Sequence, residues 1–141
     1  MELAMEVSFE VTAQEREAIL KPLLAYNRSH TGELPYETVG ILLRDPDSQE
    51  VVGGLYGKIS YKWMFVELLS IPDSMRTQGT GTRLMRTAEN LAREKGCTGI
   101  WLDTFSFQAP GFYRKLGFSE VGHIADYPPG HQRYFFQKRL V

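Results

Sequence analysis

The amino-terminal part of the chain alternates apolar and polar residues and then changes to a helical pattern. Between residues 5 and 11 every second residue is apolar, and a period of two predicts a strand with one buried face. Thr12 and Glu15 then have the spacing of a helix capping box. The apolar residues that follow predict a helix that ends before Ser29, and Pro22 is a point at which this helix could kink or restart.

The middle of the chain is rich in apolar residues, in segments that are typical of β-strands. Residues 27–37 contain Gly32 and Pro35 among polar side chains, and we expect a loop or a short irregular helix there. Three apolar segments follow, separated by short polar turns. Their closeness in sequence predicts an antiparallel meander, with strands at residues 39–44, 51–60 and 63–71.

Residues 79–95 give the clearest helical pattern in the chain. Their apolar residues fall on one stripe with charges opposite, and Gly96 follows where a C-terminal glycine is expected. The rest of the chain predicts a strand, a short helix and two further strands at residues 99–105, 109–116, 118–124 and 133–140. The strand, loop, helix and strand within residues 63–105 should pair parallel with a right-handed crossover. The pattern predicts a mixed α/β (α+β) fold, and no linker or repeat divides residues 1–141, which we expect to form a single domain.

Composition narrows the possible functions. The chain has 141 residues, 43% of them hydrophobic, and a formal net charge of -1, so it can close a core but lacks the basic surface of a nucleic-acid-binding protein. A single cysteine, Cys97, excludes an intramolecular disulfide. His30, His123 and His131 lack metal-ligand spacing. Because no signal-peptide pattern or membrane-spanning run is present, we expect a soluble, cytoplasmic protein without a metal.

A glycine-containing loop precedes the clearest helix. Residues 76–81 read Arg-Thr-Gln-Gly-Thr-Gly. The first turn of a helix offers unpaired N–H groups and a partial positive charge, and glycines let a ligand approach the backbone, so a pyrophosphate would fit. Arg76 and Arg83 could add charge-assisted contacts. The alternative is a turn that only starts a helix. The established P-loop and Rossmann patterns are absent, so a phosphate site here would be of another type.

The next motif makes a family resemblance specific. Residues 109–118 read Ala-Pro-Gly-Phe-Tyr-Arg-Lys-Leu-Gly-Phe, and their order and spacing after the loop resemble the two central motifs of the GNAT acetyltransferase superfamily. The resemblance covers residues 63–125. It implies the GNAT fold, which is a mixed, mostly antiparallel sheet of six to seven strands with a central, splayed parallel pair and about four flanking helices. It also implies an enzyme, an N-acetyltransferase that moves the acetyl group of acetyl-CoA to a primary amine by direct attack in a ternary complex, and a possible homodimer.

The resemblance assigns cofactor contacts to three places. The loop would hold the CoA pyrophosphate through Arg76, Thr77, Gln78, Gly79, Thr80, Gly81 and Thr82, with Thr80 in a slot that is often aliphatic. The pantetheine arm would pair with the strand end at Leu69, Ser70 and Ile71, where an N–H near Leu69 could bind the thioester oxyanion. The family commonly has an asparagine where this chain has Ser106. That contact could pass to Ser106, to Gln108 or to the backbone.

Glu67 is the candidate general base. An acceptor amine must lose a proton, and Glu67 is the one ionisable group in the apolar run 63–71, on the strand where many GNAT enzymes carry a catalytic glutamate. Partial burial would raise its affinity for a proton. Alternatively, Glu67 faces solvent or pairs with Lys58 or Lys62, and a neighbouring side chain or a water relay serves as the base.

Tyr113 is the candidate proton donor to the departing thiolate. It aligns with the tyrosine to which the family commonly gives that role. The alternative is an aromatic side chain that only packs beside Phe112 and Phe118.

The sequence does not identify the acceptor amine. A small-molecule or peptide amine fits equally well, and the Tyr127–His131 loop together with residues 27–38 could overhang the acceptor. The competing function is a non-catalytic acyl-CoA-binding or regulatory domain that has kept the loop and lost turnover.

Overall fold

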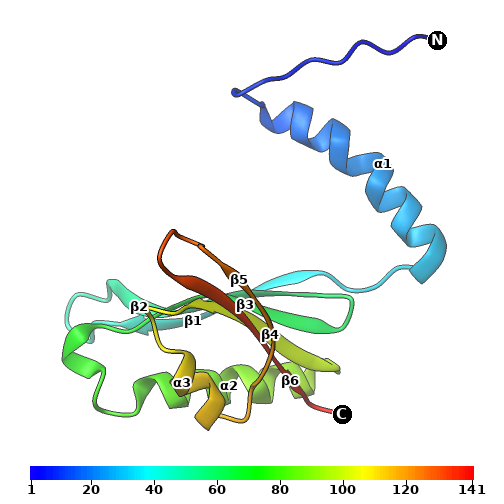
Figure 1. The fold of residues 1–141 in the computed structure, drawn as a ribbon. Helices are drawn as coiled ribbons and strands as arrows, with labels where there is room; N and C mark the ends of the chain where they lie inside the picture. The colour runs from blue at the N-terminus through cyan, green and yellow to red at the C-terminus, as the bar shows by residue number, and fades with distance from the viewer. The chain divides into compact units, whose positions relative to one another are not determined.

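A computed structural model describes residues 1–141 and divides the chain into two compact units, Met1–Leu34 and Pro35–Val141 (Figure 1). The expectation that residues 1–141 form one domain stays a prediction. No helix in the chain is long and apolar enough to cross a membrane.

The first unit is built on helix α1, Ala13–Thr31. The predicted capping box begins it: the Thr12 hydroxyl accepts from the Glu15 N–H at 3.0 Å, and the Glu15 carboxylate accepts from the Thr12 N–H at 2.9 Å. These hydrogen bonds lower the pKa of Glu15. The helix continues through Pro22 and does not restart there, although a proline inside a helix removes one backbone hydrogen bond.

Two expectations for this unit are wrong. The helix does not end before Ser29 but continues to Thr31, where Gly32, at φ +69°, closes it by donating its N–H to the Arg28 carbonyl. Residues 5–11 form no strand. Alternation alone does not make a strand, because its backbone needs a neighbouring strand to bond with, and the Met1–Leu34 unit contains only one helix.

The second unit is a six-stranded mixed sheet. Its strand order is β1-β2-β3-β4-β6-β5, and every neighbouring pair is antiparallel except β3 and β4. The predicted meander and the predicted parallel pair are both confirmed. The strands are β1 (Glu37–Arg44), β2 (Val51–Ser60), β3 (Trp63–Ser70), β4 (Gly99–Phe105), β5 (Ser119–Ala125) and β6 (Gln132–Arg139).

Helices α2 (Thr80–Glu94) and α3 (Pro110–Lys115) lie on one face of this sheet (Figure 1). A short 3-10 helix, η1 (Asp73–Met75), precedes α2. The chain has three α-helices instead of the four expected, because only one helix precedes the sheet. The apolar stripe of α2 packs against the sheet and forms the core with Met64, Val66, Ile100, Leu102 and Phe136.

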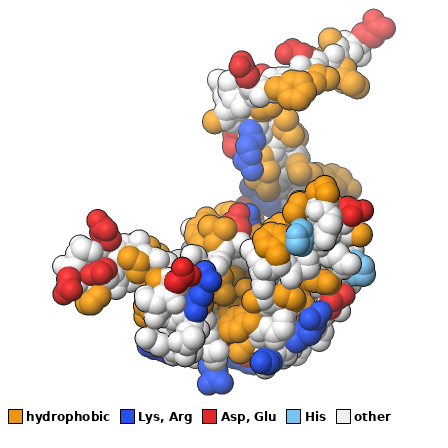
Figure 2. Space-filling model, turned by 60° about the vertical axis from the view of Figure 1, so that its left-hand side comes forward, with side chains coloured by type: hydrophobic (Ala, Val, Ile, Leu, Met, Phe, Trp, Pro, Cys, Tyr) orange, Lys and Arg blue, Asp and Glu red, His pale blue; other side chains and the backbone are white.

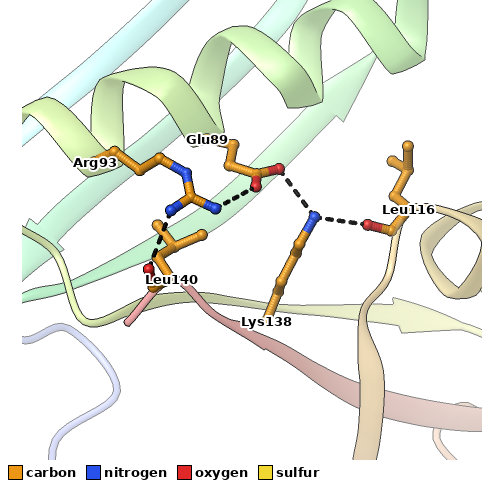
Figure 3. Close-up of polar contacts among 5 residues, drawn as sticks. All are labelled: Glu89, Arg93, Leu116, Lys138 and Leu140. Atoms are coloured by element: carbon orange, nitrogen blue, oxygen red, sulfur yellow. Dashed lines mark hydrogen bonds and ion pairs between the residues drawn. The ribbon is translucent and has the colours of Figure 1, made fainter.

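A charged network fixes α2 to the edge of this core (Figure 3). Glu89 of α2 accepts from Arg93 at 3.0 Å and from Lys138 of β6 at 3.1 Å. Lys138 also donates to the Leu116 carbonyl at 2.9 Å, and Arg93 donates to the Leu140 carbonyl at 3.0 Å. Burial alone would raise the pKa of Glu89, but the hydrogen bonds and charges of Lys138 and Arg93 lower it below its ordinary value. The network therefore stabilises the fold only while Glu89 is ionised.

Glu89→Gln should lower the free energy of unfolding at pH 7 by about 1–3 kcal/mol, because the partly buried Lys138 and the more exposed Arg93 both lose their carboxylate partner. A group whose folded-state pKa is lowered contributes stability above its ordinary pKa, here 4.5, and loses it as the pH falls through the folded value. The difference in Tm between wild type and variant should therefore be full at pH 7 and shrink below pH 4.5. Thermal unfolding followed by circular dichroism across this range measures it.

Glu120→Gln is the matched control, because the Glu120–Arg114 pair has the same 3.0 Å distance as the Glu89–Arg93 pair but a more exposed carboxylate, 32% against 21%. It should cost less than about 1 kcal/mol. Equal losses from the two variants would contradict the structural role of the Glu89 network.

Candidate functional site

The parallel pairing of β3 and β4 stops partway along both strands. Four residue pairs join them, ending at Val66 opposite Leu102. Beyond this point β3 continues to Ser70 and β4 to Phe105, and each pairs only on its outer side, with β2 and with β6. The two strands therefore splay as the family resemblance implies. Their inner edges leave backbone groups without a strand partner, and a buried backbone group needs one.

A β-bulge places Glu67 at the point where the strands separate. Tyr56 of β2 pairs with Leu68 and Gly57 with Val66, which leaves Glu67 as the extra residue. Gly57 permits this close approach, because a Cβ there would lie 2.5 Å from the Phe65 carbonyl oxygen. Glu67 is exposed, so the expected partial burial is absent. It forms no ion pair with Lys58 or Lys62, and its catalytic role stays a prediction.

The loop before α2 presents an uncapped helix N-terminus. Gly79 is the N-cap at φ +74°, and no side chain caps the first turn. A Cβ on Gly79 would meet nothing within 4 Å, so the space in front of this turn is open. Thr80 and Gly81 are buried, and Gly81 lies close to the Ile71 and Phe112 side chains. Two exposed side chains of the loop make local contacts. Arg76 forms an ion pair with Asp73 at 3.0 Å, and the Gln78 amide NH₂ donates to the Ser74 carbonyl.

The remaining loop residues keep their predicted place. Thr77 lies between η1 and α2, and Thr82 and Arg83 lie in the first turn of α2. Leu69 packs against the core, whereas Ser70 is exposed at the end of β3. The structure thus brings the strand end and the loop next to one another through Ile71, whose side chain contacts Gly81.

Tyr113 of α3 is buried against the core. Its ring makes edge contacts with Phe112 at 5.1 Å and Phe118 at 6.1 Å between centroids. Burial, with a smaller contribution from the negative charge of Asp103, raises the pKa of Tyr113 to about 12. Its phenol therefore stays protonated at neutral pH. A packing role and a donor role for Tyr113 are compatible, because a tyrosine whose ring is buried can still direct its hydroxyl toward a ligand.

Ser106 and Gln108 are engaged in the turn that follows β4. The Ser106 hydroxyl accepts from the Gln132 N–H at 3.1 Å and lies 3.3 Å from Nδ1 of His131. The Gln108 amide oxygen accepts from the Thr104 hydroxyl at 3.1 Å and from the Phe105 N–H at 2.8 Å. A cofactor contact from Gln108 would therefore have to use its amide NH₂ group.

The sequence interpretation missed an ion pair on the other side of the splay. Asp103 is the first residue of β4 beyond the paired segment, and its carboxylate accepts from Arg133 of β6 at 2.8 Å. This bond raises the pKa of Arg133. Asp103 is the one charged residue in the apolar strand 99–105. A lone charge in an apolar strand is also the pattern that made Glu67 a candidate. Its partner could not be found without the register of β4 on β6, which brings Asp103 and Arg133 within reach.

A second, apolar hollow lies elsewhere on the sheet. It has a volume of about 350 Å³ and is lined by Trp63, Trp101, Val121, Phe135, Phe136 and Gln137. It offers no ionisable group, so it lacks the means for acid–base chemistry. No group of three or more His, Cys, Asp or Glu side chains could hold a metal ion. The splayed strands remain the candidate site.

The arrangement can hold a long phosphorylated ligand and expose it to acid–base groups. The open N-terminus of α2 suits an anion, and the gap between β3 and β4 lies beside it. Glu67 and Asp103 flank the start of the gap. Figure 2 shows a hollow with hydrophobic side chains inside it and both basic and acidic side chains at its rim.

Known proteins resemble this chain over most of its length. The sequence profile of the Acetyltransferase (GNAT) family matches residues 7–118. An acetyltransferase from Agrobacterium fabrum is 35% identical over 128 residues, which cover 91% of this chain and 93% of that protein. The blasticidin-S acetyltransferase of Streptomyces morookaense is 42% identical over 92 residues, covering 64% of this chain and 68% of that protein. A crystal structure of an acetyltransferase from Agrobacterium tumefaciens has a TM-score of 0.91 at 34% identity and covers 97% of this chain and 99% of that chain.

The environment of Tyr113 can be measured directly. At pH 11 a phenol with a pKa of about 12 is roughly one tenth ionised, whereas one with the ordinary value of 10 is about nine tenths ionised. The ultraviolet titration of wild type minus that of Tyr113→Phe should therefore show almost no tyrosinate at pH 11. Near-ultraviolet circular dichroism checks that both proteins stay folded. Full ionisation in the difference at pH 11 would contradict the burial of this phenol.

Proposed function

We propose, on the premise that this chain belongs to the GNAT acetyltransferase family, that it is an N-acetyltransferase using acetyl-CoA and a primary amine. The observation that carries the proposal is the separation of β3 from β4 after Val66 and Leu102, next to the uncapped N-terminus of α2. A thioester arm needs such a gap, and a pyrophosphate needs such a helix end.

The residues present fit the proposed co-substrate. Gly79 leaves open space in front of an uncapped first turn, so the N–H groups of residues 78–81 would bind the pyrophosphate. Arg76 would add a charge-assisted contact after exchanging its exposed partner Asp73. The unpaired inner edge at Leu69, Ser70 and Ile71 would pair with the amides of the pantetheine arm. An N–H near Leu69 would stabilise the oxyanion.

Acetyl transfer then proceeds by direct attack. The amine nitrogen forms a bond to the thioester carbonyl carbon, and the carbon–sulfur bond breaks with its electron pair going to sulfur. The attacking nitrogen gives up its proton to Glu67, directly or through water, because an ammonium has no electron pair to donate. Glu67 suits this role by position, since the bulge holds it at the start of the gap.

Tyr113 would assist the departing sulfur as a hydrogen-bond donor. Its pKa of about 12 keeps the phenol protonated at neutral pH. A thiol has a pKa of about 8.5, so the thiolate is a weaker base than the phenolate and the phenol would donate a hydrogen bond without giving up its proton. The sulfur would then take its proton from water.

The acceptor class follows from the relatives. A blasticidin-S acetyltransferase and a streptothricin acetyltransferase are similar to this chain, which favours the amine of a small molecule over that of a peptide. A cytoplasmic location, where acetyl-CoA is available, and a homodimer, which is the habit of the family, belong to the same proposal.

Variants of the two proposed acid–base residues test the enzyme. Tyr113→Phe and Glu67→Gln should each lower kcat by roughly 10- to 100-fold, because the first removes the hydrogen-bond donor to the departing sulfur and the second removes the proton acceptor, while acetyl-CoA binding changes little. Thiol release from acetyl-CoA with a panel of primary amines measures the rate, and calorimetry measures binding. Tyr61→Phe and Glu120→Gln change the same residue types away from the gap and should leave both unchanged.

Two outcomes would contradict the proposal. Tight acetyl-CoA binding without turnover of any amine would indicate the non-catalytic acyl-CoA-binding domain. Full activity in both variants would remove Glu67 and Tyr113 from the chemistry.

A further inference from the structure

The turns that follow β4 and β5 carry exposed aromatic side chains. Thr104 is buried on the helix side of the sheet, and because side chains alternate along a strand, its neighbours Asp103 and Phe105 point to the opposite face. Phe107 of the β4–α3 turn is 56% exposed, and Tyr127 of the β5–β6 turn is 41% exposed. We name Phe105, Phe107 and Tyr127 the aromatic platform.

The platform rings lie against one another. Phe105 and Phe107 stack with centroids 5.3 Å apart and planes within 6°, and Tyr127 lies 5.8 Å from Phe105 at 45°. His131 makes an edge contact with Phe107 at 4.9 Å. These three aromatic rings therefore form one continuous apolar surface whose outer faces meet water. A planar partner would gain both burial and ring stacking on such a surface.

Arg133 holds the platform in place. Its guanidinium lies 5.7 Å from the Phe105 ring centroid and 4.9 Å from that of Tyr127. It donates to the Tyr127 hydroxyl and to the Asp103 carboxylate, both at 2.8 Å. Its charge is thus matched inside the protein. The surface offered to a ligand is therefore the rings, which are already arranged, so a ligand loses little affinity to ordering them.

The two turns are also joined to each other. The Ser106 N–H donates to the Gln132 carbonyl at 2.8 Å, and the Ser106 hydroxyl accepts from the Gln132 N–H. The β5–β6 turn is closed by the His131 N–H, which donates to the Pro128 carbonyl at 2.9 Å. Phe107 and Tyr127 therefore belong to one rigid surface, although twenty residues separate them in sequence.

The platform borders the gap between β3 and β4. Asp103 is the first residue of β4 beyond the pairing, and Phe105 lies two residues further, about 7 Å along the strand. Both point away from the face on which α2 starts. A thioester that enters from the α2 side would therefore meet, through the gap, an acceptor that rests on the platform.

We propose that the aromatic platform binds the acceptor and selects amines that carry a planar ring. This inference rests on the proposed N-acetyltransferase function. The ring stacks on Phe107 and Tyr127, and the nitrogen then reaches the start of the gap beside Asp103 and Glu67. The aromatic rings, and not a net charge, provide the selectivity.

A matched pair of amines tests the inference. 2-Phenylethylamine and 2-cyclohexylethylamine have the same amine, the same linker and the same number of carbons, and the saturated ring is at least as hydrophobic. Stacking should give the phenyl compound a kcat/KM roughly 3- to 10-fold higher than that of the cyclohexyl compound. Thiol release from acetyl-CoA measures kcat/KM. For an amine that turns over slowly, competition against the fastest acceptor measures it instead. Equal values, or a preference for the cyclohexyl compound, would overturn the inference.

Phe107→Leu should abolish the preference, because it keeps an apolar side chain and removes the ring. It should raise the KM for 2-phenylethylamine roughly 3- to 10-fold and leave the KM for acetyl-CoA and the Tm unchanged. Tyr61→Asn is the control, since it removes an exposed aromatic residue from the β2–β3 turn and should leave the preference intact. If Phe107→Leu lowers kcat/KM equally for the two amines, the Phe107 side chain supports the fold and does not recognise the planar ring of the acceptor.

The two proposals fail in different ways. If no amine releases thiol, the enzyme function is wrong and the acceptor inference falls with it. If amines are acetylated without regard to a planar ring, the enzyme function stands and only the platform is wrong.

Discussion

The site depends on the limited pairing of β3 with β4. Four residue pairs hold these strands parallel, and their side chains on one face, among them Met64, Val66, Ile100 and Leu102, are fully or almost fully buried under α2. The pairing and the core hold the near ends together, whereas beyond Val66 and Leu102 each strand pairs only with its outer neighbour, β2 or β6. The bulge at Glu67 continues this divergence, because an extra residue bends its strand. A rigid sheet thus contains a gap at a fixed position.

The elements around the gap are held by separate interactions. The Glu89 network ties the carboxyl half of α2 to β6 and to the end of α3, so the open N-terminus of α2 keeps its direction toward the gap (Figure 3). On the opposite face, Arg133 joins β6 to the end of β4 and to the β5–β6 turn. Ligand-binding groups on both faces are therefore supported by side chains that have no part in the proposed chemistry, which is how a precise site is built on a scaffold.

Local patterns in the sequence predict most of the sheet and the parallel unit at its centre. The helix at α2 has a one-sided apolar stripe and a closing glycine, and the strands around it are apolar and bounded by turns, so their limits agree with the structure to within about two residues. Residues 5–11 show where pattern fails: the alternation is present, but strand formation requires a partner that lies elsewhere in the chain. The pairing of Asp103 with Arg133 could not be predicted either, because it depends on the register of strands thirty residues apart. The same limit applies to the aromatic platform, which joins two turns that local sequence does not connect.

The central claim is that the loop at residues 76–81 and the adjacent gap bind a CoA thioester, and ligand-dependent thermal stability tests it most directly. A ligand that binds only the folded state must raise the Tm. With acetyl-CoA, CoA, ATP and NAD compared at equal concentrations, the Tm should rise clearly with the two CoA compounds and little with ATP or NAD. No rise with either CoA compound, or a larger rise with ATP or NAD, would mean that the loop is a helix-starting turn or a nucleotide site of another kind, and the proposed function would fail.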